Sequence, residues 1–194
     1  MRQAAAWIAA ILIGAVLGLG SAWGALMFAR GNASETYGLW AHSRLAGAAA
    51  ADPYTRAVVA REGLLALSAR EALYFNLSLD QDGRPLQEAC VYELSAPRIA
   101  ARWWSVTLYA QDDFLVQNTD HAASIDASRT ATSPGGGWRA RISPVRGDAV
   151  NWLSSRNARR GFSLTLRVYN PEQRFRRAED ALPQLARLSC AGER

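Results

Sequence analysis

Two segments in which apolar and polar side chains alternate constrain the fold of this chain more than any other feature. In residues 102–109, Trp104, Val106 and Leu108 alternate with polar or amphipathic side chains. Residues 162–169 repeat the pattern 60 positions later. A period of two indicates a β-strand with one buried face. We therefore predict that these segments are the central strands of a β-domain.

Shorter alternating segments surround these two strands. Turn-forming sequences, such as Asp80–Gly83 and Pro134–Gly137, separate them. Strands are expected at 72–79, 90–94, 114–116, 124–126, 138–142 and 151–153, with the first two paired as a hairpin, and helix or coil is expected at 174–185. Many short strands joined by tight turns predict a mainly β fold, either a sandwich or a barrel, over residues 72–194.

The N-terminal region contains 27 consecutive residues without a charge, from Gln3 to Ala29. A helix of this length exceeds the hydrocarbon thickness of a bilayer, which is about 30 Å. Trp7 and Trp23 lie near its two ends, where aromatic side chains suit the membrane interface. We predict an uncleaved transmembrane helix over residues 1–30. The alternative is a cleaved signal peptide, whose apolar region is usually only about 7–15 residues long.

Small residues recur at every fourth position of this helix. Such a stripe allows a second helix to approach closely, although glycine and alanine are also common in membrane helices generally. A helix partner is therefore one of two interpretations of the stripe Ala6, Ala10, Gly14, Gly18 and Ala22.

Residues 31–71 are expected to form helices that link the membrane helix to the β-domain. Ser34 is a candidate N-cap for a helix that passes through Trp40 and reaches residues 48–51. Asp52-Pro53 predicts the start of a second helix. The spacing of Ser68 and Glu71 fits a capping box before the first strand.

Cysteine and charge usage restrict the chemistry that the chain supports. The two cysteines, Cys90 and Cys190, either form a disulfide or remain two separate thiols. All 22 basic residues are arginine, so mechanisms that need a lysine amine are excluded. The net charge of +5 is spread along the chain rather than clustered, which disfavours a nucleic-acid partner.

The sequence contains no recognisable catalytic motif. His42 and His121 are the only histidines, too few for a metal centre built on several imidazoles, and we expect no metal and no cofactor. A polar loop explains Asp112, Asp113, Asp120 and His121 better than a cation site does. Carboxylates that could serve an envelope hydrolase are candidates by residue type alone: Glu88, Glu93, Asp112 and Asp113.

A surface hypothesis remains. If the two long strands pair in matched register, their polar sides form one face, with aromatic rings, hydroxyls and a guanidinium suited to a sugar or polar polymer. The alternative is an ordinary outer face in which Ser and Thr follow strand propensity. The candidate ligand-binding residues are Trp103, Ser105, Thr107, Tyr109, Ser163, Thr165, Arg167 and Tyr169.

Several motifs resemble one known family. The segments RWWSVTLY at 102–109, NWL at 151–153 and GFSLTLRVYNP at 161–171 resemble the domain-of-unknown-function 1214 family of bacterial proteins. The resemblance covers roughly residues 39–171 and implies a jelly-roll-like antiparallel β-sandwich in an envelope-associated protein. Where the family pattern has Asn-Pro followed by Arg-Tyr-Ser, this chain has Asn118-Thr119 and then Ala122-Ala123-Ser124. The family carries no established reaction, so no catalytic residue is transferred.

Together these features predict a single-pass protein of the bacterial inner membrane with its β-domain in the periplasm. The expected function is a non-catalytic module that binds an envelope component or partner. The alternative is an envelope hydrolase acting on a glycan or another polar substrate.

Overall fold

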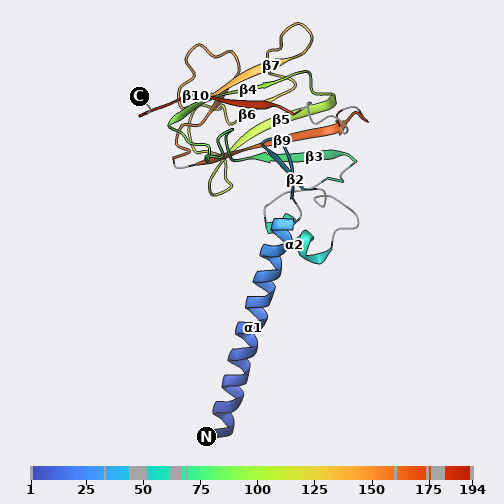
Figure 1. The fold of residues 1–194 in the computed structure, drawn as a ribbon, viewed down its shortest axis with the longest axis vertical. Helices are drawn as coiled ribbons and strands as arrows, with labels where there is room; N and C mark the ends of the chain where they lie inside the picture. The colour runs from blue at the N-terminus through green and yellow to red at the C-terminus, as the bar shows by residue number, and fades with distance from the viewer. Residues whose placement is uncertain are drawn as a thin grey trace.

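The structure is a computed structural model, which describes residues 2–32, 34–43, 52–61, 67–68, 70–159, 161–173, 175 and 182–192. Figure 1 shows a long helix projecting from two packed β-sheets, with the N-terminus at the far end of the helix. The described elements are α1 (Arg2–Asn32), β1 (Ser34–Tyr37), β2 (Trp40–Ser43), α2 (Pro53–Arg61), β3 (Ala72–Leu77), β4 (Cys90–Ala96), β5 (Ala101–Ala110), β6 (Ser124–Asp126), β7 (Trp138–Ser143), β8 (Trp152–Ser154), β9 (Phe162–Pro171) and β10 (Gln184–Cys190).

The strands form two sheets. The larger has the order β1-β2-β3-β9-β5-β6, and the smaller has the order β10-β4-β7-β8. All pairs in the larger sheet are antiparallel, whereas β7 and β8 are parallel. The predicted mainly β fold behind an apolar N-terminal helix is confirmed. The jelly-roll connectivity stays a prediction.

The core lies between the sheets and consists of the apolar sides of the alternating strands. Val106 and Leu108 of β5 face Leu166 and Leu164 of β9 in register, and all four side chains are fully buried. Two aromatic contacts join the sheets. Trp104 stacks on Trp138 of β7 with ring centroids 4.8 Å apart, and Tyr92 of β4 meets Phe162 edge to face at 5.9 Å.

The predicted hairpin between the first two strands of the β-domain is wrong. β3 pairs with β9 in the larger sheet, whereas β4 pairs with β7 and β10 in the smaller one. Asp80 organises the crossing, because its Oδ1 accepts hydrogen bonds from the main-chain N–H groups of Asp82 (2.9 Å) and Arg84 (3.0 Å). The turn does reverse the chain, since Leu79 and Pro85 form an antiparallel bridge across it, but the strand that follows pairs in the other sheet.

The helix expected from Ser34 is also wrong, because β1 and β2 form a hairpin there. Gly38 supplies the positive φ of 60° at the turn. Trp40 is 1% exposed and donates its indole N–H to the carbonyl of Pro183 at 2.7 Å. This contact spans 143 residues and overrides the local preference. The continuation expected through residues 48–51 lies outside the described residues.

The second linker prediction is correct at its start. α2 begins at Pro53, and the Asp52 Oδ1 atom accepts the Tyr54 N–H at 2.9 Å as an N-cap. Ser68 and Glu71 do bond side chain to side chain at 2.7 Å, but Glu71 belongs to a turn that leads directly into β3.

The helix or coil expected at 174–185 is wrong at its end, because Gln184 and Leu185 begin strand β10. Residues 174 and 176–181 lie outside the described residues. β10 pairs along β4, where Cys190 lies opposite Cys90, and the two sulfur atoms are bonded. Arg187 of β10 forms an ion pair with the buried Asp80 carboxylate at 3.4 Å. β10 is thus attached to the turn between β3 and β4.

α1 contains the apolar stretch Gln3–Phe28, which has a mean hydropathy of 2.1. It is long and apolar enough to cross a membrane, and it is not buried against the described remainder of the protein. The helix-pairing role of its small residues stays a prediction.

Removing the disulfide should weaken the β-domain. A bridge across a separation of 100 residues restricts the unfolded chain strongly, so Cys90→Ala/Cys190→Ala should lose about 4–5 kcal/mol of unfolding free energy on the chain-entropy account. Urea unfolding of the full chain in micelles measures this, and wild type with reductant should match the variant. Equal midpoints for oxidised wild type and variant would contradict the bridge.

Candidate functional site

The register of β5 and β9 brings all eight predicted face residues to one side of the larger sheet. Four cross-strand pairs make up this set: Trp103 with Tyr169, Ser105 with Arg167, Thr107 with Thr165, and Tyr109 with Ser163. We call these eight residues the polar face. Its residues lie back to back with the apolar core positions of the same strands, as the period of two requires.

The polar face has a buried layer and an outer layer. Ser105, Thr107 and Thr165 are only 7%, 8% and 6% exposed. Thr165 satisfies its hydroxyl by donating to Asn76 Oδ1 of β3 at 2.8 Å. These hydroxyls therefore stabilise the sheet rather than meet solvent. The half-buried outer layer consists of Trp103, Tyr109, Ser163, Arg167 and Tyr169.

Arg167 is the central charged group of this layer. Its Nη2 atom donates to the Tyr109 hydroxyl at 2.8 Å, and its Nη1 atom donates to Thr107 Oγ1 at 3.3 Å. The guanidinium carbon lies 5.5 Å from the centroid of the Tyr109 ring. In the part of the chain that the structure describes, no carboxylate lies within ion-pairing distance of Arg167. Neutral oxygens and a ring thus orient a half-buried cation that no carboxylate of the described residues balances.

The nearest acid in register is engaged elsewhere. Asp126 of β6 lies opposite Ser105, which in turn lies opposite Arg167. Its Oδ2 atom accepts from Arg129 Nε at 2.7 Å, and its Oδ1 atom accepts the Ser128 N–H at 2.9 Å. Burial opposes ionisation of this carboxylate, but these hydrogen bonds prevail, so the pKa of Asp126 lies below its ordinary value.

Two aromatic rings occupy the end of the polar face beside Arg167. Trp103 and Tyr169 lie with centroids 5.4 Å apart and planes inclined by 55°. The Trp103 indole N–H donates to Ser128 Oγ at 3.1 Å, which fixes the ring. Fixed aromatic surfaces beside a cation provide stacking area together with a directional donor.

A second polar cluster was not predicted from the sequence. Asp120 Oδ2 accepts hydrogen bonds from Ser154 Oγ at 2.6 Å and Arg156 Nε at 2.9 Å, and Asn118 donates to the Arg156 carbonyl at 2.9 Å. The hydrogen bond from Ser154, followed by that from Arg156, lowers the pKa of Asp120. The partners are more than 30 residues apart in the chain, so no local pattern indicated them. The cluster attaches the loop around Asp120 to β8. This is the loop whose sequence differs from the family pattern.

The four carboxylates considered for hydrolysis occupy different settings. Glu88 accepts the main-chain N–H groups of Asn157 (2.9 Å) and Arg159 (2.7 Å), two positions with positive φ. Asp112 accepts the Phe114 N–H at 3.2 Å in the turn after β5, where Asp113 follows it. Glu93 lies on β4 opposite Arg141. Glu88 and Asp112 therefore stabilise turns.

The histidines occupy ordinary positions. His42 Nδ1 lies 2.8 Å from the Tyr74 carbonyl, and its ring stacks on Phe75 at 4.7 Å. His121 is exposed and adopts a φ of 52° beside Asp120. Among the described residues, no group of three or more His, Cys, Asp or Glu side chains is arranged to hold a metal ion.

Fold and face together define a β-sandwich domain with one polar, aromatic-edged sheet surface. The profile of the family described as "Protein of unknown function (DUF1214)" matches residues 71–173, and the chain belongs to this family. The match runs from the start of β3 past the end of β9 and therefore includes the whole polar face.

One solved structure supports the fold. The crystal structure of the VPA0106 protein from Vibrio parahaemolyticus aligns with a TM-score of 0.59 and 20% identity, over 72% of this chain and 36% of that one. An uncharacterised protein from Burkholderia cenocepacia aligns with a TM-score of 0.48 and 14% identity, over 63% of this chain and 31% of that one. The chain thus spans about a third of each of these proteins. No curated protein matches significantly.

The Asp120 cluster predicts acid sensitivity. Because the pKa of Asp120 is lower in the folded state than its ordinary value of 3.8, its contribution to stability is present above that value and is lost as the pH falls through the folded pKa. Asp120→Asn should therefore be less stable than wild type at about pH 6, with the difference shrinking toward about pH 3. Urea midpoints at both pH values measure this. A difference that is constant with pH would contradict the role of the ionised carboxylate.

Proposed function

We propose that this protein is a membrane-tethered, non-catalytic binding module of the bacterial envelope. Its polar face binds an anionic, polyhydroxylated envelope component, such as a glycan that carries carboxylates. The observation that carries the proposal is Arg167, a half-buried guanidinium held by Tyr109 and Thr107 without a carboxylate partner among the described residues.

The chemistry of the face favours an anionic ligand. A guanidinium already oriented by two hydroxyls loses little side-chain freedom when it binds a carboxylate. Partial burial reduces competition from water, so a charge-assisted hydrogen bond there contributes more than one on an open surface. The rings of Tyr109, Trp103 and Tyr169 offer stacking surfaces for a sugar ring on either side of that charge.

The proposal places the β-domain in the periplasm, with α1 in the inner membrane. A single residue, Ala33, separates α1 from β1, so the sheet that carries the polar face begins directly after the helix. The bonded pair Cys90 and Cys190 suits an oxidising compartment. The small-residue stripe of α1 would allow a second membrane helix to pack against it.

Substitution of Arg167 tests the binding role. Arg167→Gln keeps a hydrogen-bonding side chain but removes the charge, and it should reduce binding to isolated peptidoglycan sacculi about 10-fold or more, since a hydrogen bond to a charged group contributes about 1.5–3 kcal/mol. Full-length protein in nanodiscs is cosedimented with the sacculi, and the bound fraction is measured.

Arg102→Gln is the matched control. Arg102 lies on β5 but is exposed and outside the polar face, so the same charge is lost from the same sheet. This control should bind like wild type. Equal losses of binding in both variants would show that only the net charge matters, which would contradict a specific site. Undiminished binding by Arg167→Gln would refute the proposed site. A wild type that does not bind sacculi would refute it as well.

Topology is tested separately. Alkaline phosphatase folds actively only where its disulfides form, so its fusion after Arg194 should be active in a bacterial host. In a second fusion, several acidic residues replace Arg2. This change removes the positive charge on the N-terminal side of α1, which is one of the signals that set membrane orientation. An inactive wild-type fusion that is present at normal abundance would place the β-domain in the cytoplasm and contradict the periplasmic proposal.

A further inference from the structure

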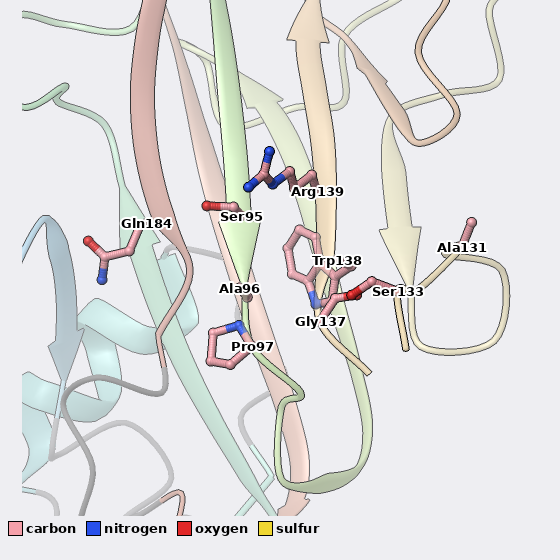
Figure 2. Close-up of a pocket in the computed structure, with 9 residues that line it drawn as sticks. All are labelled: Ser95, Ala96, Pro97, Ala131, Ser133, Gly137, Trp138, Arg139 and Gln184. Atoms are coloured by element: carbon pink, nitrogen blue, oxygen red, sulfur yellow. The ribbon is translucent and has the colours of Figure 1, made fainter. Parts of the chain in front are cut away.

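A cavity of about 580 Å³ lies at one end of the smaller sheet, away from the polar face. Figure 2 shows that its walls come from the end of β4, the start of β7, the start of β10 and the loop before β7. Its volume is in the range that accommodates a small organic molecule. The lining residues are Ser95, Ala96, Pro97, Ala131, Ser133, Gly137, Trp138, Arg139 and Gln184.

The strand register sets three polar side chains in one row across this cavity. Gln184 of β10 lies opposite Ser95 of β4, and Ser95 lies opposite Arg139 of β7. Neighbours in such a row have Cβ atoms about 5 Å apart, so one small ligand can reach all three. Arg139 is exposed, and within the described ranges no carboxylate lies at ion-pairing distance from it. The next outward arginine of β7, Arg141, is instead paired with Asp148 at 2.8 Å.

Trp138 supplies an independent observation. Its side chain is 4% exposed, yet its indole N–H has no hydrogen-bond acceptor among the described residues. A buried donor without an acceptor costs about 1–3 kcal/mol. The ring is held by stacking on Trp104 with planes inclined by 13°, and Figure 2 draws its nitrogen on the side of Ser133. The nitrogen has almost no accessible surface, so an acceptor brought by a ligand would satisfy this donor after a small local shift of the cavity wall.

Hydrogen bonds between its segments support the walls of the cavity. Asn151, the first residue of the NWL motif, exchanges two hydrogen bonds with Ala131 at 2.8 Å and also donates to the Arg139 carbonyl at 2.8 Å. The loop of Ser133 and Gly137 closes on itself, because the Ser133 N–H and hydroxyl both donate to the Gly137 carbonyl, at 2.7 and 2.9 Å. Asn151 is therefore a positioning residue that fixes the loop against β7.

We infer that this cavity is a second binding site, which takes a small organic oxyanion. Arg139 and the Trp138 indole provide only donors, so the ligand must bring acceptor oxygens, and the guanidinium favours a negative charge. Ala96 and Pro97 at the end of β4, and Ala131 on the far side of Ser133, supply apolar surface for its carbon skeleton. The charged group is a carboxylate or a phosphate ester. The site lies on the opposite sheet from the polar face and does not depend on ligand binding there.

Three sugars with one carbon skeleton test the inference. Glucuronate carries a carboxylate, glucose 6-phosphate carries a phosphate, and glucose is neutral. Each is titrated into the full chain in micelles, with indole ¹⁵N–¹H resonances recorded and the Trp138 resonance assigned by its loss in Trp138→Phe. We expect at least one anion to shift this resonance saturably to lower field, as a new hydrogen bond requires, and glucose to leave it in place. The anion that acts distinguishes carboxylate from phosphate.

Two variants of matched charge complete the test. Arg139→Gln should weaken the affinity about 10-fold or more, while Arg141→Gln on the same strand and face should not change it. The remaining indole resonances report that each variant is folded. A Trp138 resonance that responds to neither anion at millimolar concentration, or that responds equally to glucose, would overturn the inference. Unchanged affinity in Arg139→Gln would do the same.

Discussion

The antiparallel pairing of β5 with β9 is the interaction on which the rest of the structure depends. β9 is an interior strand that pairs with β3 on its other side, so its main chain is bonded along both edges. The pairing sets Val106 against Leu166 and Leu108 against Leu164. These buried side chains form the larger sheet's side of the core, and the smaller sheet packs against them. A shift of one residue would turn these side chains outward, so burial and register enforce each other.

The same register produces the polar face. Once the apolar side of each strand is committed to the core, Arg167, Tyr109, Trp103 and Tyr169 must share the other side. The acid nearest in register, Asp126, is bound by Arg129, which leaves the Arg167 guanidinium to neutral hydroxyls. A charge in that setting contributes little to folding, and for this reason we propose that it recognises a ligand.

The sequence predicted those parts of the fold that short-range periodicity determines. The alternation of Trp104, Val106 and Leu108 identified β5 and its outward partners, and Asp52-Pro53 identified the start of α2. Contacts between segments that are distant in the chain could not be predicted from the sequence. The β1–β2 hairpin depends on the burial of Trp40 against Pro183, and β10 depends on pairing along β4. The turn at Asp80 was recognised as a turn, but its chemistry does not reveal which sheet receives the next strand.

The candidate sites likewise divide into one that local periodicity predicts and others that depend on contacts between distant segments. All eight polar-face residues came from two strands, so matched alternation was enough to place them together. The buried state of Ser105, Thr107 and Thr165 was not predictable, because alternation along a strand shows which side a residue takes but not how far that side is covered. The cavity beside Arg139 draws on four separate segments, and the Asp120 cluster joins a loop to β8, so neither leaves a local signal in the sequence.

Native-state hydrogen exchange measures the central claim most directly. If β5 and β9 are the pair that holds the domain together, the amides of Val106, Leu108, Leu164 and Leu166 should exchange only through global unfolding, with the slowest rates in the domain. Amides of the edge strand β1 should exchange much faster. The account would be contradicted if the β5 and β9 amides exchanged as fast as those of β1 while the β4 and β7 amides stayed protected. That result would place the stable core in the smaller sheet.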